Sequence, residues 1–186
     1  MTGMTWHNEP VAWSLNAGTL TVECAADTDF WRKTHYGFVH ANGHFYYREI
    51  SGDFRVEVKA EGQYLNQYDQ AGLMLWLDER NWLKAGVEFL DGRRVLSVVV
   101  THEFSDWSVD SAEAAEVVTV RVTREGDAVT VEFIDADGTP KMARLAYMGP
   151  EIPARVGPMA CAPSGAGFIA TFSGWRLGFG EASQNG

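Results

Sequence analysis

The 186-residue chain is 46% hydrophobic and 12% aromatic, which excludes a generally disordered protein and allows a substantial buried core. Its formal net charge is −10, and its 15 Lys and Arg residues are spread among 25 Asp and Glu residues, which argues against nucleic acid and anionic membranes as partners. No apolar run approaches the ~20 residues that cross a bilayer, and the N-terminus has no secretion-signal pattern, so we predict a soluble, cytoplasmic protein.

Short strands are predicted along almost the whole chain. Apolar and polar residues alternate at 19–24, at 54–59 and, on both sides of a turn, at 118–134, and this period of two is typical of half-buried strands. The sequence therefore predicts an all-β fold, a two-sheet antiparallel β-sandwich of the concanavalin A-like jelly-roll kind. No linker or internal repeat divides the chain, so we expect one domain over residues 1–186 with an ordered core of about 7–178.

The first long loop, residues 29–40, is rich in aromatic and cationic side chains. Such a composition is costly to expose, and it suits recognition better than spacing. Trp31 offers a flat apolar surface on which a sugar ring can stack while neighbouring polar groups take its hydroxyls. The alternative is that Trp31 is an ordinary core tryptophan.

Residues 70–102 are predicted to form a three-stranded meander. Asp91-Gly92 suits a two-residue type I′ turn, which pairs Leu90 with Arg93 and fixes the register of the last two strands. This register assigns one set of residues to the inner, core face of the meander. The outer face then carries Gln70, Gly72, Met74, Trp76, Trp82, Lys84, Gly86, Glu88, Val95, Ser97, Val99 and Thr101.

The first turn of this meander does not fit the same pattern. A four-residue loop at residues 78–81 would shift the alternation by one residue, so that the two strands would place their apolar residues on opposite faces. We therefore expect a bulge or a five-residue loop near residues 77–82.

The outer face of the meander has an unusual composition for a solvent-exposed sheet. It combines Trp, Met, Gly, Lys and Glu, and its glycines open space beside large side chains. In a curved jelly roll this face is concave, and concave surfaces that mix aromatic and polar groups suit ligands. The alternative is that loops cover the face and that the glycines ease the twist of the sheet.

A second candidate wall is the predicted loop at residues 101–108. Trp107 follows the third strand of the meander and is flanked by Ser and Asp. Like Trp31, it offers either a stacking surface for a sugar ring or an ordinary core side chain.

The sequence does not point to catalysis. The glycine motifs of nucleophile elbows, P-loops and dinucleotide-binding folds do not occur, and neither does the E-x-D-x-E motif of jelly-roll glycosidases. Lys84 beside Glu88 suggests a neutralised pair rather than a poised acid. We therefore predict no catalytic residue.

Metal and cofactor sites are not predicted either. His35, His40 and His44 are closely spaced, but histidine ligation normally needs carboxylates or further histidines placed by rigid elements. Cys24 and Cys161 lie in strand-like stretches without a C-x-x-C pattern, so we interpret them as small buried residues.

Long blocks of the chain resemble a known family. Residues 69–89, DQAGLMLWLDERNWLKAGVEF, resemble the signature of the regulator-of-enolase family, a family of concanavalin A-like domains of unknown function. Residues 29–37 (DFWRKTHYG), 104–109 (FSDWSV) and 156–163 (VGPMACAP) look like its other blocks. The resemblance covers about residues 7–178. It implies a two-sheet jelly roll with a concave face, and it implies no catalytic residues.

Within that resemblance one residue departs from the family. Trp76 stands where the family has a more polar side chain, so we expect it to enlarge the aromatic part of the outer face.

We therefore predict a non-catalytic protein that binds a carbohydrate or another small molecule. The predicted ligand-binding residues are Trp31, Lys33, His35, Gln70, Lys84, Glu88 and Trp107. In this hypothesis the tryptophans stack on the ligand, Lys84 and Glu88 fix hydroxyls or a carboxylate, and His35 and Gln70 act at the rim. Two alternatives remain: a carbohydrate-active enzyme that uses Glu88 with Asp106 or His35, and a regulatory protein-interaction module of carbohydrate metabolism that docks a partner on the same face.

Overall fold

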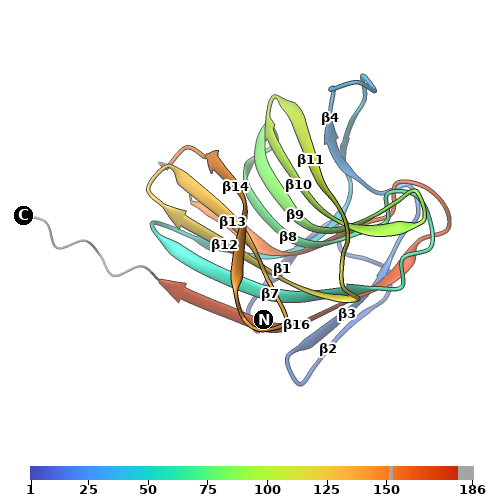
Figure 1. Cartoon of the computed structure of the whole chain (residues 1–186), viewed down its shortest axis with the longest axis horizontal. Coiled ribbons are helices and arrows are strands. Elements are labelled where there is room, and N and C mark those ends of the chain that lie inside the picture. The colour runs from blue at the N-terminus through green and yellow to red at the C-terminus, as the bar shows by residue number, and fades with distance from the viewer. Residues whose placement is uncertain (151–152, 180–186) are drawn as a thin grey trace, which may run out of the picture.

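The chain folds into two facing β-sheets (Figure 1). The structure, a computed structural model, describes residues 1–150 and 153–179. Sheet A consists, in spatial order, of β1 (Thr5–His7), β6 (His44–Ile50), β15 (Ala154–Cys161), β8 (Gln70–Asp78), β9 (Asn81–Leu90), β10 (Arg93–His102) and β11 (Phe104–Glu113). Sheet B consists of β14 (Pro140–Tyr147), β13 (Ala128–Ile134), β12 (Val117–Glu125), β7 (Phe54–Gly62), β16 (Phe168–Phe179), β3 (Thr19–Cys24) and β2 (Trp13–Asn16).

All strand pairs within the two sheets are antiparallel, which confirms the predicted two-sheet antiparallel sandwich. The predicted domain also includes residues 151–152 and 180–186, which lie outside the described residues. Among the described residues there is no helix that could cross a membrane.

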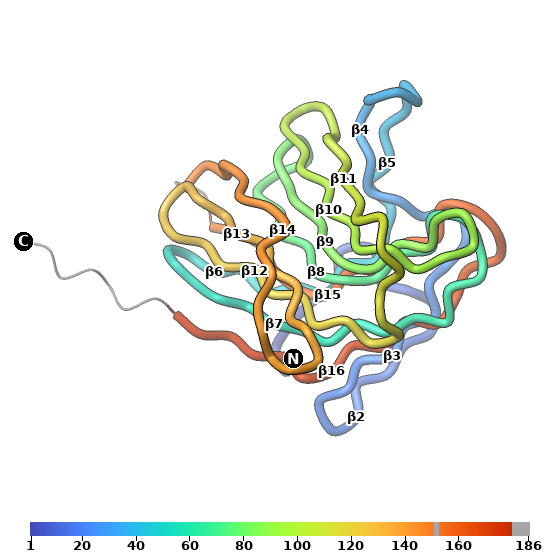
Figure 2. The backbone as a smooth tube through the Cα atoms, viewed as in Figure 1, coloured from blue at the N-terminus to red at the C-terminus, as the bar shows by residue number. Residues whose placement is uncertain are grey.

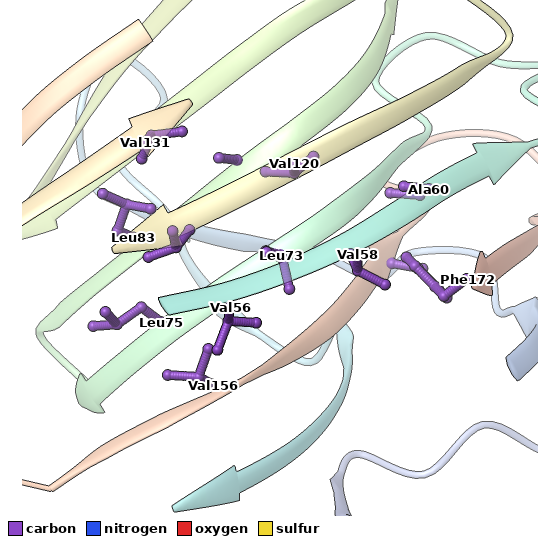
Figure 3. Close-up of a cluster of buried hydrophobic side chains, with 14 of the residues drawn as sticks. Val56, Val58, Ala60, Leu73, Leu75, Leu83, Val120, Val131, Val156 and Phe172 are labelled. Carbon is purple, nitrogen blue, oxygen red and sulfur yellow. The ribbon is translucent and has the colours of Figure 1, made fainter. Parts of the chain in front are cut away.

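The main core lies between the sheets and follows from the strand alternation. On β7, Val56 and Val58 are fully buried, whereas Arg55 and Lys59 on either side of them are exposed. Figure 3 shows how side chains from both sheets meet, for example Val120 of β12. Each fully buried aliphatic side chain contributes about 1.5–3 kcal/mol relative to its exposed state, so the alternating valines hold the two sheets face to face.

The predicted register of the meander is confirmed. Leu90 pairs with Arg93 across the Asp91-Gly92 turn, and the outer-face residues of β8, β9 and β10 are brought opposite one another as expected. The predicted irregularity is also present, as a bulge in β8 between Trp76 and Asp78. The bulge restores the alternation, so no five-residue loop is needed.

The predicted loop at residues 101–108 is wrong. His102 pairs directly with Phe104, and β11 continues as a fourth strand beside β10. The turn is made by Glu103 alone, which adopts a left-handed backbone conformation with φ of 62°. Trp107 therefore lies on a strand of sheet A, which fixes its direction more firmly than a loop would.

A small hairpin adds a third layer on the outer face of sheet A. It consists of β4 (Phe30–Arg32) and β5 (Val39–Ala41), and it projects beside β8 to β11 in both views of the backbone (Figures 1 and 2). Phe30 and Trp31 pack onto the sheet in a second buried cluster. The other members of this cluster are Phe45, Met74, Trp76, Trp82, Val99, Met159 and Cys161. Part of the outer face is thus covered, as the alternative interpretation expected.

Candidate functional site

Buried polar side chains on the outer face of sheet A mark the candidate site. Gln70, Lys84, Glu88 and Ser97 come from three neighbouring strands, and each is at most 7% exposed. The strand period places them on one face, because Gln70 pairs with Glu88 and Ser97 pairs with Gly86. Burial of polar and charged groups costs free energy unless each finds a partner, so the partners of this cluster define what it can do.

Two glycines allow the backbones of β8 and β9 to lie unusually close to each other in this part of the sheet. Gly72 and Gly86 face each other on β8 and β9, and an added Cβ at Gly86 would lie 2.2 Å from the backbone oxygen of Ala71. A cavity of about 10 Å³ lies beside Gly86, which is about the space for one water molecule. The side chains that line it include Gln70, Lys84, Ser97 and Met159.

Lys84 is held by Asp29, in the segment that leads into the β4–β5 hairpin. Its Nζ lies 3.1 Å from Asp29 Oδ1, and both side chains are largely buried. Asp29 Oδ1 also accepts the backbone N–H of Phe30, and the backbone oxygen of Asp29 accepts the N–H groups of Asn42 and Gly43. Burial lowers the pKa of Lys84, but the charge and hydrogen bond of Asp29, together with other nearby acidic groups such as Glu88, raise it, and the net shift is upward. The ion pair therefore fastens the base of the hairpin to sheet A.

Glu88 is bound by Trp107 and Ser97. The indole Nε1 of Trp107 lies 3.0 Å from Glu88 Oε2 and 3.0 Å from Ser97 Oγ, so its N–H is shared between them. Burial raises the pKa of Glu88, although Lys84, Ser97 and Trp107 act in the opposite direction. The direct partner of Lys84 is thus Asp29 rather than Glu88, whose charge acts on Lys84 at longer range.

The raised pKa of Glu88 predicts a pH-dependent effect of Glu88→Gln. A carboxyl whose pKa is raised by folding contributes stability below its unfolded pKa, and that contribution is lost as the pH rises through the folded pKa. The amide of the variant cannot ionise, so we expect the free energy of unfolding of the variant, relative to wild type, to rise as the pH increases above the usual glutamate pKa of 4.5. Urea unfolding of both proteins at several pH values measures this, and a difference that does not change with pH would contradict it.

Three aromatic side chains form the rim of the site. The ring centroids of Tyr68 and Trp107 are 6.3 Å apart with an interplanar angle of 76°. Tyr36, near the tip of the hairpin, lies close enough to the side chain of Tyr68 that this neighbour raises the pKa of Tyr36. Smaller electrostatic effects of Glu88 and Asp29 on the same hydroxyl place the rim near the buried charges. Trp107 is 37% and Tyr36 45% exposed, so both rings are accessible to a ligand.

The two tryptophans predicted to stack on a ligand have different environments. Trp31 is buried in the second cluster, and its Nε1 donates to the backbone oxygen of Thr34 at 2.9 Å. Trp107 remains half-exposed on the rim. Trp76, expected to enlarge the aromatic face, is buried and stacks on Trp82 at 6.4 Å. Of these three tryptophans, Trp107 alone offers an accessible ring.

Lys33 and His35 do not join the buried cluster. Lys33 forms an ion pair with Glu103, and Glu103 also pairs with Arg32. The Nζ of Lys33 lies 5.1 Å from the ring centroid of Phe104. His35 is part of the hairpin tip, and its ring lies edge-on to Tyr36 at 4.7 Å. Gln70, Lys84 and Glu88, by contrast, come together as predicted from their strand positions, and Trp107 joins them from β11 rather than from the predicted loop.

Sequence reasoning did not select Asp29, Tyr36, Tyr68 or Ser97 for the site. A lysine in the middle of an apolar strand signals that a carboxylate must lie nearby. That signal does not identify the carboxylate, since Asp29 is 55 positions away from Lys84 in the chain. Ser97 was placed on the correct face by the register, and its role follows from its contact with Trp107.

The cysteines and His44 show no reactive or ligating arrangement. Burial raises the pKa of Cys24 to about 12 and that of Cys161 well above its usual value. His44 Nε2 accepts the N–H of Ala25 at 3.1 Å, and its Nδ1 lies 2.8 Å from the backbone oxygen of Asn8. Over residues 1–150 and 153–179 no three His, Cys, Asp or Glu side chains are grouped as metal ligands. The polar cluster brings together an ammonium, a carboxylate, an amide and a hydroxyl, and these buried groups are bonded to partners within the protein.

Comparisons with known proteins agree with the fold. A family model described as "Protein of unknown function (DUF1349)" matches residues 6–179. "Regulation of enolase protein 1" of Saccharomyces cerevisiae is 41% identical over 175 residues, which covers 93% of this chain and 88% of the relative. The crystal structure of a functionally unknown protein from Saccharomyces cerevisiae matches with a TM-score of 0.91 at 39% identity and covers 96% of this chain and 97% of that chain. Carbohydrate binding module CBM66 from Bacillus subtilis matches in fold, with a TM-score of 0.60 at 13% identity over 95% of this chain and 98% of that chain.

Proposed function

Since the chain belongs to the DUF1349 family of proteins of unknown function, we propose a role from its site: non-catalytic binding of a carbohydrate or a similar polyhydroxylated molecule. The observation that carries this proposal is the half-exposed Trp107, whose indole N–H is anchored on the buried carboxylate of Glu88. The anchored ring has a fixed position, so a ligand that stacks on it meets a surface that is already organised.

The chemistry of a sugar fits this arrangement. A pyranose or furanose has an apolar face that packs on an aromatic ring, and its hydroxyls both donate and accept hydrogen bonds. The accessible hydrogen-bonding groups beside Trp107 are the phenols of Tyr68 and Tyr36. Glu88, Gln70 and Ser97 are buried behind the ring, and Glu88 and Ser97 hold it in place. The fold likeness to a carbohydrate binding module supports the proposal as an analogy of architecture.

The first test is a thermal-shift screen with mono- and oligosaccharides, sugar acids, sugar phosphates and glycolytic intermediates, followed by calorimetry. We expect a dose-dependent rise in Tm, since a ligand at a hundredfold excess over its Kd stabilises the native state by about 2.7 kcal/mol. Trp107→Ala is expected to weaken binding about tenfold, because it removes the stacking surface and unpairs Glu88. Trp13→Ala is the matched control, since Trp13 is 38% exposed and lies on β2 of sheet B.

Each outcome of this screen has a clear meaning. A Tm shift that disappears in Trp107→Ala and persists in Trp13→Ala supports the proposed site. A shift that both variants retain would place the ligand elsewhere on the molecule. Turnover of the bound sugar, detected by product analysis and lost in Glu88→Gln, would contradict the non-catalytic part of the proposal and favour a carbohydrate-active enzyme.

A regulatory protein-interaction module is the second candidate. It is favoured by the name of the 41% identical yeast relative, "Regulation of enolase protein 1", and by the exposed side chains of Tyr36, Phe38 and Val39 on the projecting hairpin. Sedimentation of the purified protein with purified enolase from the same organism tests it. A complex that Phe38→Ala weakens would favour this candidate, and independent sedimentation of the two proteins would argue against it.

A further inference from the structure

The rim of the candidate site continues onto the β4–β5 hairpin as a run of contacting rings. Tyr68 contacts Trp107, and the side chain of Tyr36 lies near that of Tyr68 and edge-on to Trp31 at 5.6 Å. Tyr36 then stacks on Phe38, with ring centroids 5.4 Å apart and an interplanar angle of 14°, and Phe38 lies edge-on to His40 at 4.7 Å. Aromatic residues therefore lead from the buried carboxylate of Glu88 to the outer part of the hairpin.

The rings on the hairpin are accessible, although Tyr36 also lies edge-on to the buried Trp31 at 5.6 Å. Tyr36 and Phe38 are exposed by 45% and 40%, close to the exposure of Trp107. Neither belongs to the second buried cluster, which takes Phe30 and Trp31 from the same hairpin. An exposed pair of stacked rings offers apolar area to a ligand and, as a rigid unit, loses little conformational entropy on binding.

The inner end of the site is closed. The cavity beside Gly86 has about 10 Å³, and the Lys84–Asp29 ion pair fastens the hairpin base across the sheet. Such a space admits about one water molecule, so a sugar unit on Trp107 stays outside the buried polar groups and a chain of units cannot continue through the sheet. The remaining direction with aromatic surface runs outward over Tyr36 and Phe38.

We infer that Tyr36 and Phe38 form a second subsite, and that the natural ligand is the end of an oligosaccharide rather than a single sugar. The terminal unit lies on the ring of Trp107, and the next unit packs on the Tyr36–Phe38 stack. The inference rests on the proposed function and adds the ligand class to it. It uses no covalent step, because both subsites act by stacking and hydrogen bonding.

A chain-length series tests the second subsite. Gluco-, xylo- and fructo-oligosaccharides of one to four units are titrated by calorimetry into wild type, Phe38→Ala and Phe104→Ala. In wild type we expect the second unit to increase affinity about two- to tenfold, the range for one aromatic contact. Phe38→Ala should lose that increase and keep the affinity for the single sugar. Phe104 is the matched control, since it is an exposed phenylalanine near the same hairpin that contacts Lys33 and lies outside the run of rings.

The two levels of the proposal fail in different ways. If single sugars bind at Trp107 but affinity does not change with chain length, the second subsite is wrong and the proposed function stands. If Phe38→Ala keeps the full increase for the second unit, or if Phe104→Ala loses it equally, the subsite is also wrong. If no sugar of any length binds, the proposed function itself is overturned, and the subsite with it.

Discussion

Replacing Lys84 with Met is expected to lower the free energy of unfolding by about 3–5 kcal/mol, because removal of one partner leaves a buried charge unpaired. Asp29 would lose the ammonium that neutralises it at 3.1 Å, and Glu88 would lose a nearby positive charge. For a chain of this size the loss corresponds to a Tm lower by roughly 6–20 °C. Urea unfolding at neutral pH measures the effect.

The pH at which this test is made matters. Folding raises the pKa of Lys84 above its usual value of 10.5, so its contribution to stability is fully present below that value. The contribution is lost only as the pH rises through the still higher pKa of the folded state. Measurements at neutral pH therefore report the intact ion pair.

A double variant separates the unpaired charge from simple loss of packing. Adding Asp29→Asn to Lys84→Met removes the orphaned carboxylate, so part of the lost stability should return. Lys59→Met, on the exposed face of β7, serves as the control and should change stability by no more than about 0.5 kcal/mol. Equal stability of Lys84→Met and wild type would show that the pair does not fasten the hairpin.

The second large effect is expected for Gly86→Ala. Its Cβ would lie 2.2 Å from the backbone oxygen of Ala71 and 2.6 Å from Cα of Gly72, and backbone atoms in the middle of a sheet cannot move aside cheaply. We expect a loss of about 3 kcal/mol or more, at the upper end of the range for overpacked cores. Thermal and urea unfolding measure the loss.

Gly178→Ala provides the comparison for this glycine. Gly178 also lies in a strand, on β16 of sheet B, and nothing lies within 4 Å of the position of an added Cβ. Alanine there should be neutral or slightly stabilising, since it reduces the entropy of the unfolded chain. If Gly86→Ala and Gly178→Ala have the same effect, close backbone approach is not the reason for the glycine at position 86.

The predictions that succeeded from sequence rest on local periodicity. In the meander, the Asp91-Gly92 turn fixed the pairing of Leu90 with Arg93, and every later pair followed by counting. The mismatch at the first turn correctly required an irregularity, which is the bulge between Trp76 and Asp78. Because the side-chain period of a strand is two, a single turn determines which residues share a face.

The predictions that failed concern segments without such a period. Residues 101–108 were expected to form a loop, but Glu103 adopts a left-handed conformation that turns the chain in one residue. In the aromatic segment of residues 29–40, composition did not distinguish Trp31, which is buried, from Tyr36, which is exposed. Trp31 and Tyr36 differ in burial because the hairpin presents Trp31 to the sheet and Tyr36 to solvent.

The sequence by itself therefore determined the all-β class, the register of β8 to β10 and the placement of Gln70, Lys84, Glu88 and Ser97 on one face. These features depend on alternation and on one turn, which act over a few residues. Only the tertiary structure decided that Asp29 pairs with Lys84, that Tyr68 contacts Trp107 and that Tyr36 lies near Tyr68. These contacts join segments far apart in the chain, and they depend on how the β4–β5 hairpin packs onto sheet A, which no local pattern specifies.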